Sequence, residues 1–280
     1  MRFSGSDVYA NSALNAIAAY GKTKGWNIVD VDANGSVDAA NSALTNLATR
    51  RVDAIAVSVF PTAALAAGIS AAAEAKIPVA NWGGGLGTGV PIAADVAVGE
   101  PMAARVVKDL GGSGALLALG YKPGLPCQRR EAALDDAVKT TSINVTAQQI
   151  TIPGQVESGD QATLAWAAAH PSGSAPLAVW ACFDDPATGA AAALQQLGRT
   201  DVAVYGLNGT AEALSLIKAG RLTATEYIDG PKQGNQIAGL FEQYWSNPDG
   251  FRQVEIPGDA EVIDKNNVDA FLAKHPELTK

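Results

Sequence analysis

The sequence contains little cysteine and little histidine. Only two of its 280 residues are cysteines and two are histidines. Cys127 and Cys182 form no C-x-x-C pair, and together with His170 and His275 they do not supply a zinc-type ligand set. We therefore expect no metal site and no cofactor. The two thiols are either free and buried or joined in one disulfide in an oxidising compartment, and their spacing leaves both possibilities open.

Basic charge and long apolar runs are also scarce. Lys and Arg number 20 against 28 Asp and Glu, a net charge of −8, which disfavours nucleic acid as a partner. No apolar run reaches the length of a membrane span. The first residues, MRFSGSD, lack the apolar region of a signal peptide, so we expect a processed or trimmed chain or a cytoplasmic protein. The content of 48% hydrophobic residues predicts a well-packed globular protein. The length of 280 residues is enough for two domains.

Short apolar strands alternate with amphipathic or alanine-rich helices along the chain. We predict strands at 27–32, 53–59, 77–82, 115–120, 145–150, 177–182 and 202–207, with Met1–Ser4 as a shortened first strand. We predict helices at 11–23, 37–49, 62–74, 100–109, 128–138, 160–169, 186–197, 211–218, 232–246 and 266–274. Ser36, Pro61 and Gly220 are the end signals of three of them. This alternation predicts parallel sheets with helices on both faces.

The pattern also repeats within the chain. Residues 52–80 and 175–206 share the order strand, aromatic residue, proline-capped helix and strand. Two similar α/β halves are therefore expected, with a seam near 90–99 and a tail after 228 that crosses back between them.

Aromatic and polar residues stand where several predicted strands end. Asp185 is predicted to cap the helix that Pro186 opens, which leaves Phe183 and Asp184 unexplained. Trp82 and Asn208 occupy similar strand ends. Ligands bind outside the carboxyl ends of parallel strands, so these residues favour a ligand cleft between the halves.

Catalytic and nucleotide-binding motifs are missing. GGGLGTG (83–89) lacks the G-x-G-x-x-G spacing and leads into no helix. A P-loop and the G-x-S-x-G hydrolase elbow are absent. Asp184 and Asp185 are neighbours on one turn and point in different directions, which does not suit an acid–base pair. We therefore expect no catalytic residues and no enzyme activity.

The ordered series VDAIAVSVF, KIPVANW, DVAVGEPMAARVVKDLGG, PGLPCQRREAALDDAV, WACFDDPATGAAAAL and VYGLNGT resembles the type I periplasmic solute-binding proteins of ABC importers, in the ribose- and galactose-binding group. The resemblance implies the type I periplasmic-binding-protein fold: two Rossmann-like lobes, with parallel sheets flanked by helices, joined by three crossovers and closing on a small molecule. It implies an N-terminal lobe of 1–94 plus 230–252 and a C-terminal lobe of 95–229 plus 253–280. It also implies a monomer outside the cytoplasm, in the periplasm or at the cell envelope, delivering its ligand to a membrane permease. The signal peptide of such proteins is absent from this chain.

The family's ligand positions carry over with changes. The Asp-Arg pair that grips sugar hydroxyls becomes Gly83-Gly84, and the ligand arginine falls at Gln128 or Arg129, with Arg130 as a neighbouring structural position. The resemblance implies the ligand-binding residues Asp7, Tyr9, Asn81, Trp82, Gln128, Arg129, Phe183, Asp184, Asn208, Tyr227 and Asp229. Because the sixth and eighth strands are adjacent in this fold, it also implies a Cys127–Cys182 disulfide.

The resemblance favours a neutral monosaccharide or polyol as ligand. Loss of the Asp-Arg pair leaves room for a small aromatic solute, on which Tyr9, Trp82, Phe183 and Tyr227 could stack. A ligand-sensing domain of a LacI-type regulator shares this fold and is a second alternative. The sequence shows neither the helix-turn-helix nor the basic hinge of such a regulator.

Overall fold

The computed structural model describes residues 1–173 and 175–279 and divides the chain into two compact units. The first unit comprises Met1–Ala97, Pro123–Pro126 and Asp229–Asp259, and the second comprises Val98–Lys122, Cys127–Ile228 and Ala260–Lys280. β9 (Val254–Ile256), which the expected boundaries place in the second lobe, pairs with β3 (Ile92–Ala94) in the sheet of the first unit, whereas residues 260–280 lie in the second unit. This three-residue strand is too short to show a period in sequence.

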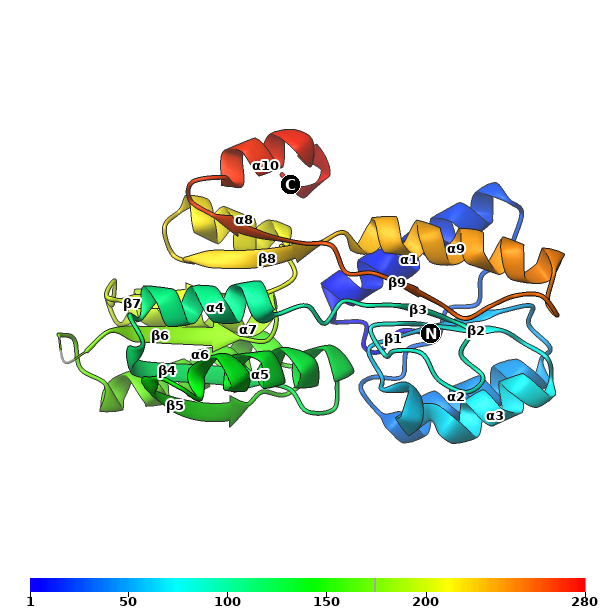
Figure 1. The fold of residues 1–280 in the computed structure, drawn as a ribbon, viewed down its shortest axis with the longest axis horizontal. Helices are drawn as coiled ribbons and strands as arrows, with labels where there is room; N and C mark the ends of the chain where they lie inside the picture. Colours follow the sequence, from blue (N-terminus) through cyan, green and yellow to red (C-terminus); the bar gives the residue numbers. More distant parts are fainter. Residues whose placement is uncertain (174, 280) are drawn as a thin grey trace. The chain divides into compact units, whose positions relative to one another are not determined.

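The first unit is built on a parallel sheet in the order β1-β2-β3-β9, where β1 is Ile55–Ser58 and β2 is Val79–Trp82. Figure 1 shows α1 (Val8–Thr23) beside α9 (Gly230–Ser246) on one face. On the other face, α2 (Val37–Thr49) lies beside α3 (Ala66–Glu74), which follows the short helix η1 (Thr62–Leu65). Val57 and Val79 are fully buried between these two layers, as the apolar patterns predict.

Two predicted strands of this unit, 1–4 and 27–32, do not form. Their contact is a single parallel bridge between Arg2 and Asp32. The Arg2 N–H donates to the Val31 carbonyl at 2.7 Å, and the Ala33 N–H donates to the Arg2 carbonyl at 3.1 Å. The prediction was wrong because an apolar alternation makes a strand only where a neighbouring backbone supplies hydrogen bonds, and residues 27–30 face no such neighbour.

The second unit contains a six-stranded sheet in the order β10-β8-β7-β6-β4-β5. Its strands are β4 (Ser113–Gly120), β5 (Ser142–Gln149), β6 (Leu177–Ala181), β7 (Val202–Tyr205), β8 (Ala224–Ile228) and β10 (Ala260–Asp264). All pairs are parallel except β8 with β10. Its helices are α4 (Glu100–Asp109), α5 (Leu125–Val138), α6 (Gln155–Ala169), α7 (Asp184–Gln196), α8 (Ala211–Lys218), α10 (Val268–Lys274) and the short η2 (Pro276–Leu278). Every residue of β6 is buried, which matches its continuous apolar sequence.

Local end signals were interpreted correctly in α2 and incorrectly in α7. The Ser36 hydroxyl accepts from the Ala39 N–H at 3.2 Å and caps α2 as predicted. In α7 the helix begins at Asp184, two residues earlier than expected, with Phe183 at the N-cap position and no side-chain cap. Asp185 therefore lies inside the first turn, where its carboxylate accepts a hydrogen bond from Gln155 at 2.9 Å. The predicted Asp185 cap was wrong because a neighbouring helix occupies this carboxylate.

The two cysteines form a disulfide. Cys127 and Cys182 are buried, their Cα atoms lie 5.2 Å apart, and the bond joins the first turn of α5 to the loop after β6. The disulfide expected from the resemblance is confirmed, and the alternative of two free thiols is wrong.

Candidate functional site

Each unit gathers aromatic and polar side chains at the carboxyl ends of its parallel strands. These ends are where loops lead into helices and where ligands bind in open α/β sheets. The predicted ligand residues are divided between the two units.

In the first unit the central feature is the indole of Trp82, the last residue of β2. The Tyr9 ring meets it edge-on, with the ring centroids 5.3 Å apart. The indole N–H donates to Gln233 Oε1 at 2.9 Å. The Gln233 amide nitrogen in turn donates to the Asp95 and Pro257 carbonyls at 2.9 and 3.1 Å, so the glutamine has a fixed orientation. This arrangement holds the Trp82 ring in one position.

Two helices begin beside this aromatic pair. Asp7 caps α1 by accepting from the Ala10 N–H at 3.0 Å, and Asp229 caps α9 by accepting from the Lys232 N–H at 2.9 Å. A Cβ added to Gly230 would lie 3.7 Å from the Trp82 ring, so glycine lets α9 begin close to the indole. Both predicted aspartates therefore have a structural role as caps.

Asn81 ties together the loops that follow β1 and β2. Its side chain is fully buried, and the amide nitrogen donates to the Phe60 carbonyl at 3.0 Å and to the Thr62 hydroxyl at 2.9 Å. A Cβ on Gly84 would overlap the Asn81 amide and the Phe60 carbonyl. The glycine in place of the family's charged residue is therefore required by the local packing. Within the described residues, Asn81 Oδ1 has no hydrogen-bond partner.

In the second unit the central side chain is Arg130 on α5, which is 2% exposed. Its guanidinium donates to the Cys182 carbonyl at 2.7 Å and to Asn208 Oδ1 at 3.0 Å. It thereby joins the loop after β6 to the loop after β7. Asn208 is buried and adopts a positive φ of 131°, and its N–H donates to the Glu226 carbonyl at 2.7 Å.

Asp184 organises the same loops from the other side. One carboxylate oxygen accepts from the Thr225 hydroxyl at 2.6 Å and the other from the Thr210 N–H at 2.7 Å. Thr225 also accepts from the Gly209 N–H at 3.1 Å. Burial raises the pKa of Asp184 to about 6, and these hydrogen bonds oppose that rise only in part.

The other predicted residues lie in different surroundings. Gln128 and Arg129 are exposed on α5, and the Gln128 amide donates to the Lys122 carbonyl. Phe183 is 8% exposed at the start of α7. The Tyr227 ring packs against the Phe271 ring of α10, with centroids 4.8 Å apart.

The sequence reasoning left Arg130 and Gln233 out of the site. Arg129 and Arg130 are adjacent, and the sequence offered no means of deciding which one faces the strand ends, because α5 has a weakly amphipathic pattern. Gln233 lies four residues after Asp229, on the first turns of a helix that follows a strand end. This position, in the first turn of a helix that follows a strand, could have indicated from the sequence that Gln233 lies near the strand ends.

The chemistry of both groups suits a neutral, hydroxylated molecule. Amides, a guanidinium and carboxylates can exchange hydrogen bonds with hydroxyl groups, and the rings of Trp82 and Phe183, which are 1% and 8% exposed, are apolar. No cluster of three or more His, Cys, Asp or Glu side chains in the described part of the chain could hold a metal ion. In the same residues, no helix has both the length and the apolar character needed to cross a membrane.

Comparison with known proteins adds a family and a set of related folds. A family model described as periplasmic binding protein domain matches residues 1–248. An ABC transporter solute-binding protein from Agrobacterium vitis with bound allitol is 24% identical, with 98% of this chain and 97% of that chain covered and a TM-score of 0.88. The periplasmic component of the arabinose ABC transporter of Shewanella is 17% identical, with coverage of 99% and 94% and a TM-score of 0.87. A solute-binding protein from Bacillus halodurans with bound myo-inositol is 22% identical, with coverage of 98% and 96% and a TM-score of 0.83. No curated protein matches the chain.

Proposed function

This chain belongs to the periplasmic binding protein family, and on that premise we propose that it captures a small neutral monosaccharide or polyol for an ABC importer. The proteins of similar fold include binding proteins that hold allitol, arabinofuranose and myo-inositol. The family consists of binding proteins and not of enzymes, and it indicates a location outside the cytoplasm. A membrane permease is the proposed partner.

The observation that carries this proposal is the fixed orientation of Trp82. Its ring is 1% exposed, the Tyr9 ring meets it edge-on, and its N–H donates to the Gln233 side-chain oxygen. A rigid indole at a strand end can stack on the C–H face of a sugar ring or polyol chain without losing conformational freedom on binding. We propose that it forms the apolar wall of the ligand site.

In the second unit, we propose that Asn208 and Arg130 supply polar contacts to ligand hydroxyls. Asp184 acts differently, since both of its carboxylate oxygens accept hydrogen bonds from the protein. It keeps the loop around Asn208 in its positive-φ conformation. Phe183, Tyr227, Asn81, Asp7, Tyr9, Gln128, Arg129 and Asp229 complete the proposed set.

Ligand contacts from both units would favour a closed state, which the permease recognises. X-ray scattering with and without a saturating ligand tests this step, and the radius of gyration should decrease on binding. An unchanged radius at saturation would refute closure and leave the binding function standing.

A small aromatic solute is the second candidate ligand. The observation that favours it is the Gly83-Gly84 pair, which stands where the resemblance expects an Asp-Arg clamp. The regulator alternative is not favoured, because the reported relatives of similar fold are transport proteins.

A thermal-shift screen of polyols, monosaccharides and small aromatic compounds tests the proposal, because a ligand that binds the native state raises the melting temperature. Calorimetry with the best ligand should then show weaker binding to Trp82→Leu and Asn208→Ala. Lys139→Ala, at an exposed position after α5, serves as the matched control. Unchanged affinity in both site variants would place the ligand elsewhere. A screen in which only aromatic compounds bind would refute the sugar proposal and support its alternative.

A further inference from the structure

The backbone N–H groups of the loop after β7 are bonded inside the second unit. Those of residues 208–210 donate to the Glu226 carbonyl, the Thr225 hydroxyl and the Asp184 carboxylate, at 2.7, 3.1 and 2.7 Å in that order. Because these donors already have acceptors, a ligand that reaches the loop meets side chains instead. The first of these is Asn208, whose backbone is held at a φ of 131°.

The side-chain amide of Asn208 has one favourable orientation. The Arg130 guanidinium donates to Asn208 Oδ1 at 3.0 Å. A guanidinium carries N–H donors and no acceptor, so turning the amide over would set its NH2 group against another donor. Oδ1 therefore faces Arg130, and Nδ2 faces away from it.

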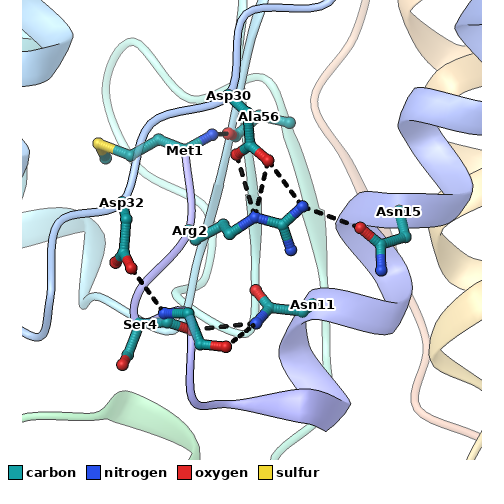
Figure 2. Close-up of polar contacts among 9 residues, drawn as sticks. Met1, Arg2, Ser4, Asn11, Asn15, Asp30, Asp32 and Ala56 are labelled. Atoms are coloured by element: carbon teal, nitrogen blue, oxygen red, sulfur yellow. Dashed lines mark hydrogen bonds and ion pairs between the residues drawn. The ribbon is translucent and has the colours of Figure 1, made fainter. Parts of the chain in front are cut away.

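The amide nitrogen of Asn208 is left without a partner. Within the described residues Nδ2 donates to no group, and it is not one of the fully enclosed polar atoms that lack a partner, so it keeps contact with solvent. Asn11 in the first unit has the opposite arrangement, since its amide nitrogen donates to the Ser4 and Gly5 carbonyls, both at 3.1 Å (Figure 2). Asn208 is 5% exposed and Asn11 is 6% exposed. The two asparagines therefore differ in hydrogen bonding and not in burial.

The guanidinium that orients Asn208 is itself fixed in place. It also donates to the Cys182 carbonyl at 2.7 Å. Cys127, one helical turn before Arg130 on α5, is joined to Cys182 by the disulfide, so α5 is attached to the same residue twice. A Cβ added to Gly99 would lie 3.1–3.3 Å from Arg130 atoms, which shows that the start of α4 packs closely against this side chain. Arg130 therefore has little freedom to release the Asn208 oxygen.

The proposed function brings Asn208 into contact with a ligand, and on that basis we propose that Arg130 is a positioning residue that fixes the polarity of the contact. Asn208 Nδ2 donates, and the ligand atom that meets it is an oxygen acting as acceptor. A sugar hydroxyl can accept by turning its hydrogen toward another group, and a ring or carbonyl oxygen accepts without turning. An ammonium group, which only donates, does not fit this position. The donor is in place before binding, so ordering this side chain does not reduce the affinity.

The first test needs no ligand. In the full chain with isotope-labelled asparagine, NMR measures how fast side-chain amide protons exchange with water. Those of Asn208 should exchange at least about tenfold faster than those of Asn11, the matched control, because only the Asn11 protons are hydrogen-bonded within the protein. Equal protection of the two amides would overturn the proposal, because Asn208 Nδ2 would then have an acceptor inside the protein.

The same measurement on two variants tests the role of Arg130. Arg130→Lys keeps a side chain that only donates, whereas Arg130→Gln can donate or accept. Exchange at Asn208 should stay fast in Arg130→Lys and become slower in Arg130→Gln, because the Asn208 amide can then turn and donate to the glutamine oxygen. A purely structural role for Arg130 would lower the melting temperature of both variants without separating them in exchange. Equal exchange at Asn208 in the two variants would therefore refute the orienting role.

Calorimetry tests the ligand side of the proposal. The probes are D-galactose, D-ribose and D-mannitol, each with the analogues in which one hydroxyl is replaced by fluorine, which cannot donate. Asn208→Asp keeps an acceptor for Arg130 but turns a carboxylate oxygen toward the ligand in place of the N–H group. For a probe that binds, fluorine at one position should weaken binding to Asn208→Asp about tenfold more than binding to wild type. At the other positions it should affect both proteins equally.

The outcomes separate this proposal from the proposed function. Equal effects of fluorine in wild type and Asn208→Asp at every position would overturn the proposal and leave the binding function standing. Binding of none of the three parent probes to wild type would count against the proposed function instead, and the exchange measurements would still decide the polarity of Asn208.

Discussion

Replacing Glu226 by glutamine should change how the stability of this protein depends on pH. Glu226 lies in β8 and is 1% exposed. One carboxylate oxygen accepts from the Met102 N–H at 3.2 Å, and the other has no hydrogen-bond partner within the described residues. Burial, opposed by the charge of Arg130 and reinforced by that of Glu100, raises the pKa of Glu226 from 4.5 to about 7.

Proton linkage determines whether the stability rises or falls with pH. Between pH 4.5 and 7 the native state binds more protons at Glu226 than the unfolded state does, so this group makes stability fall as the pH rises. A rise of about 2.5 pKa units corresponds to about 3 kcal/mol of unfolding free energy. Glutamine keeps an acceptor for Met102 and does not titrate. Buried Asp184 titrates in the same direction, but it is present in both proteins and cancels from their difference.

Urea unfolding of wild type and Glu226→Gln at pH 4.5, 6 and 7.5 measures this effect. The stability of the variant relative to wild type should increase by about 3 kcal/mol across this range, whatever the constant cost of burying the amide. Glu74→Gln, on the exposed last turn of α3, controls for the change in net charge. Parallel curves for wild type and Glu226→Gln would refute the reasoning, since they would mean that the carboxylate is not desolvated in the native state.

Three further changes test the packing around the candidate site. Replacing Cys127 and Cys182 together by serine should lower the free energy of unfolding by about 4 kcal/mol, because the bond closes a loop of 55 residues, and urea titration under non-reducing conditions would detect it. Gly84→Ala should cost about 2–4 kcal/mol of stability in thermal melts, because the added Cβ overlaps buried backbone and side-chain atoms. Gly239→Ala, in open space on α9, is the control and should be neutral or stabilising. Asp184→Ala should lower stability by about 2–3 kcal/mol because two donors lose their acceptor, and a loss within 0.5 kcal/mol of zero in urea titration would show that water replaces the carboxylate.

Local sequence determined most of the helices. The helices at 37–49, 100–109 and 211–218 have the boundaries that were predicted. Their end signals act over one or two turns, as the Ser36 hydroxyl does at the start of α2. The apolar strands of the sheet interiors, such as β6, were also predictable, because a fully buried strand has a continuous apolar sequence. The order of these elements was enough to indicate two α/β halves and the family.

The tertiary structure alone decided which extended segments pair and which polar side chains face the strand ends. Residues 224–228 contain Thr225 and Glu226 and were not predicted as a strand, yet they form β8 because β7 and β10 supply partners on both sides. Residues 27–32 also alternate as a strand should, but within the described residues only Asp32 takes part in a bridge, to Arg2, and no strand forms there. Strand formation depends on hydrogen bonds to residues distant in sequence, whereas a helix forms its own. Likewise, the choice of Arg130 over Arg129 rests on a rotation of about 100° between successive helical residues, which only the packing of α5 against the strand ends determines.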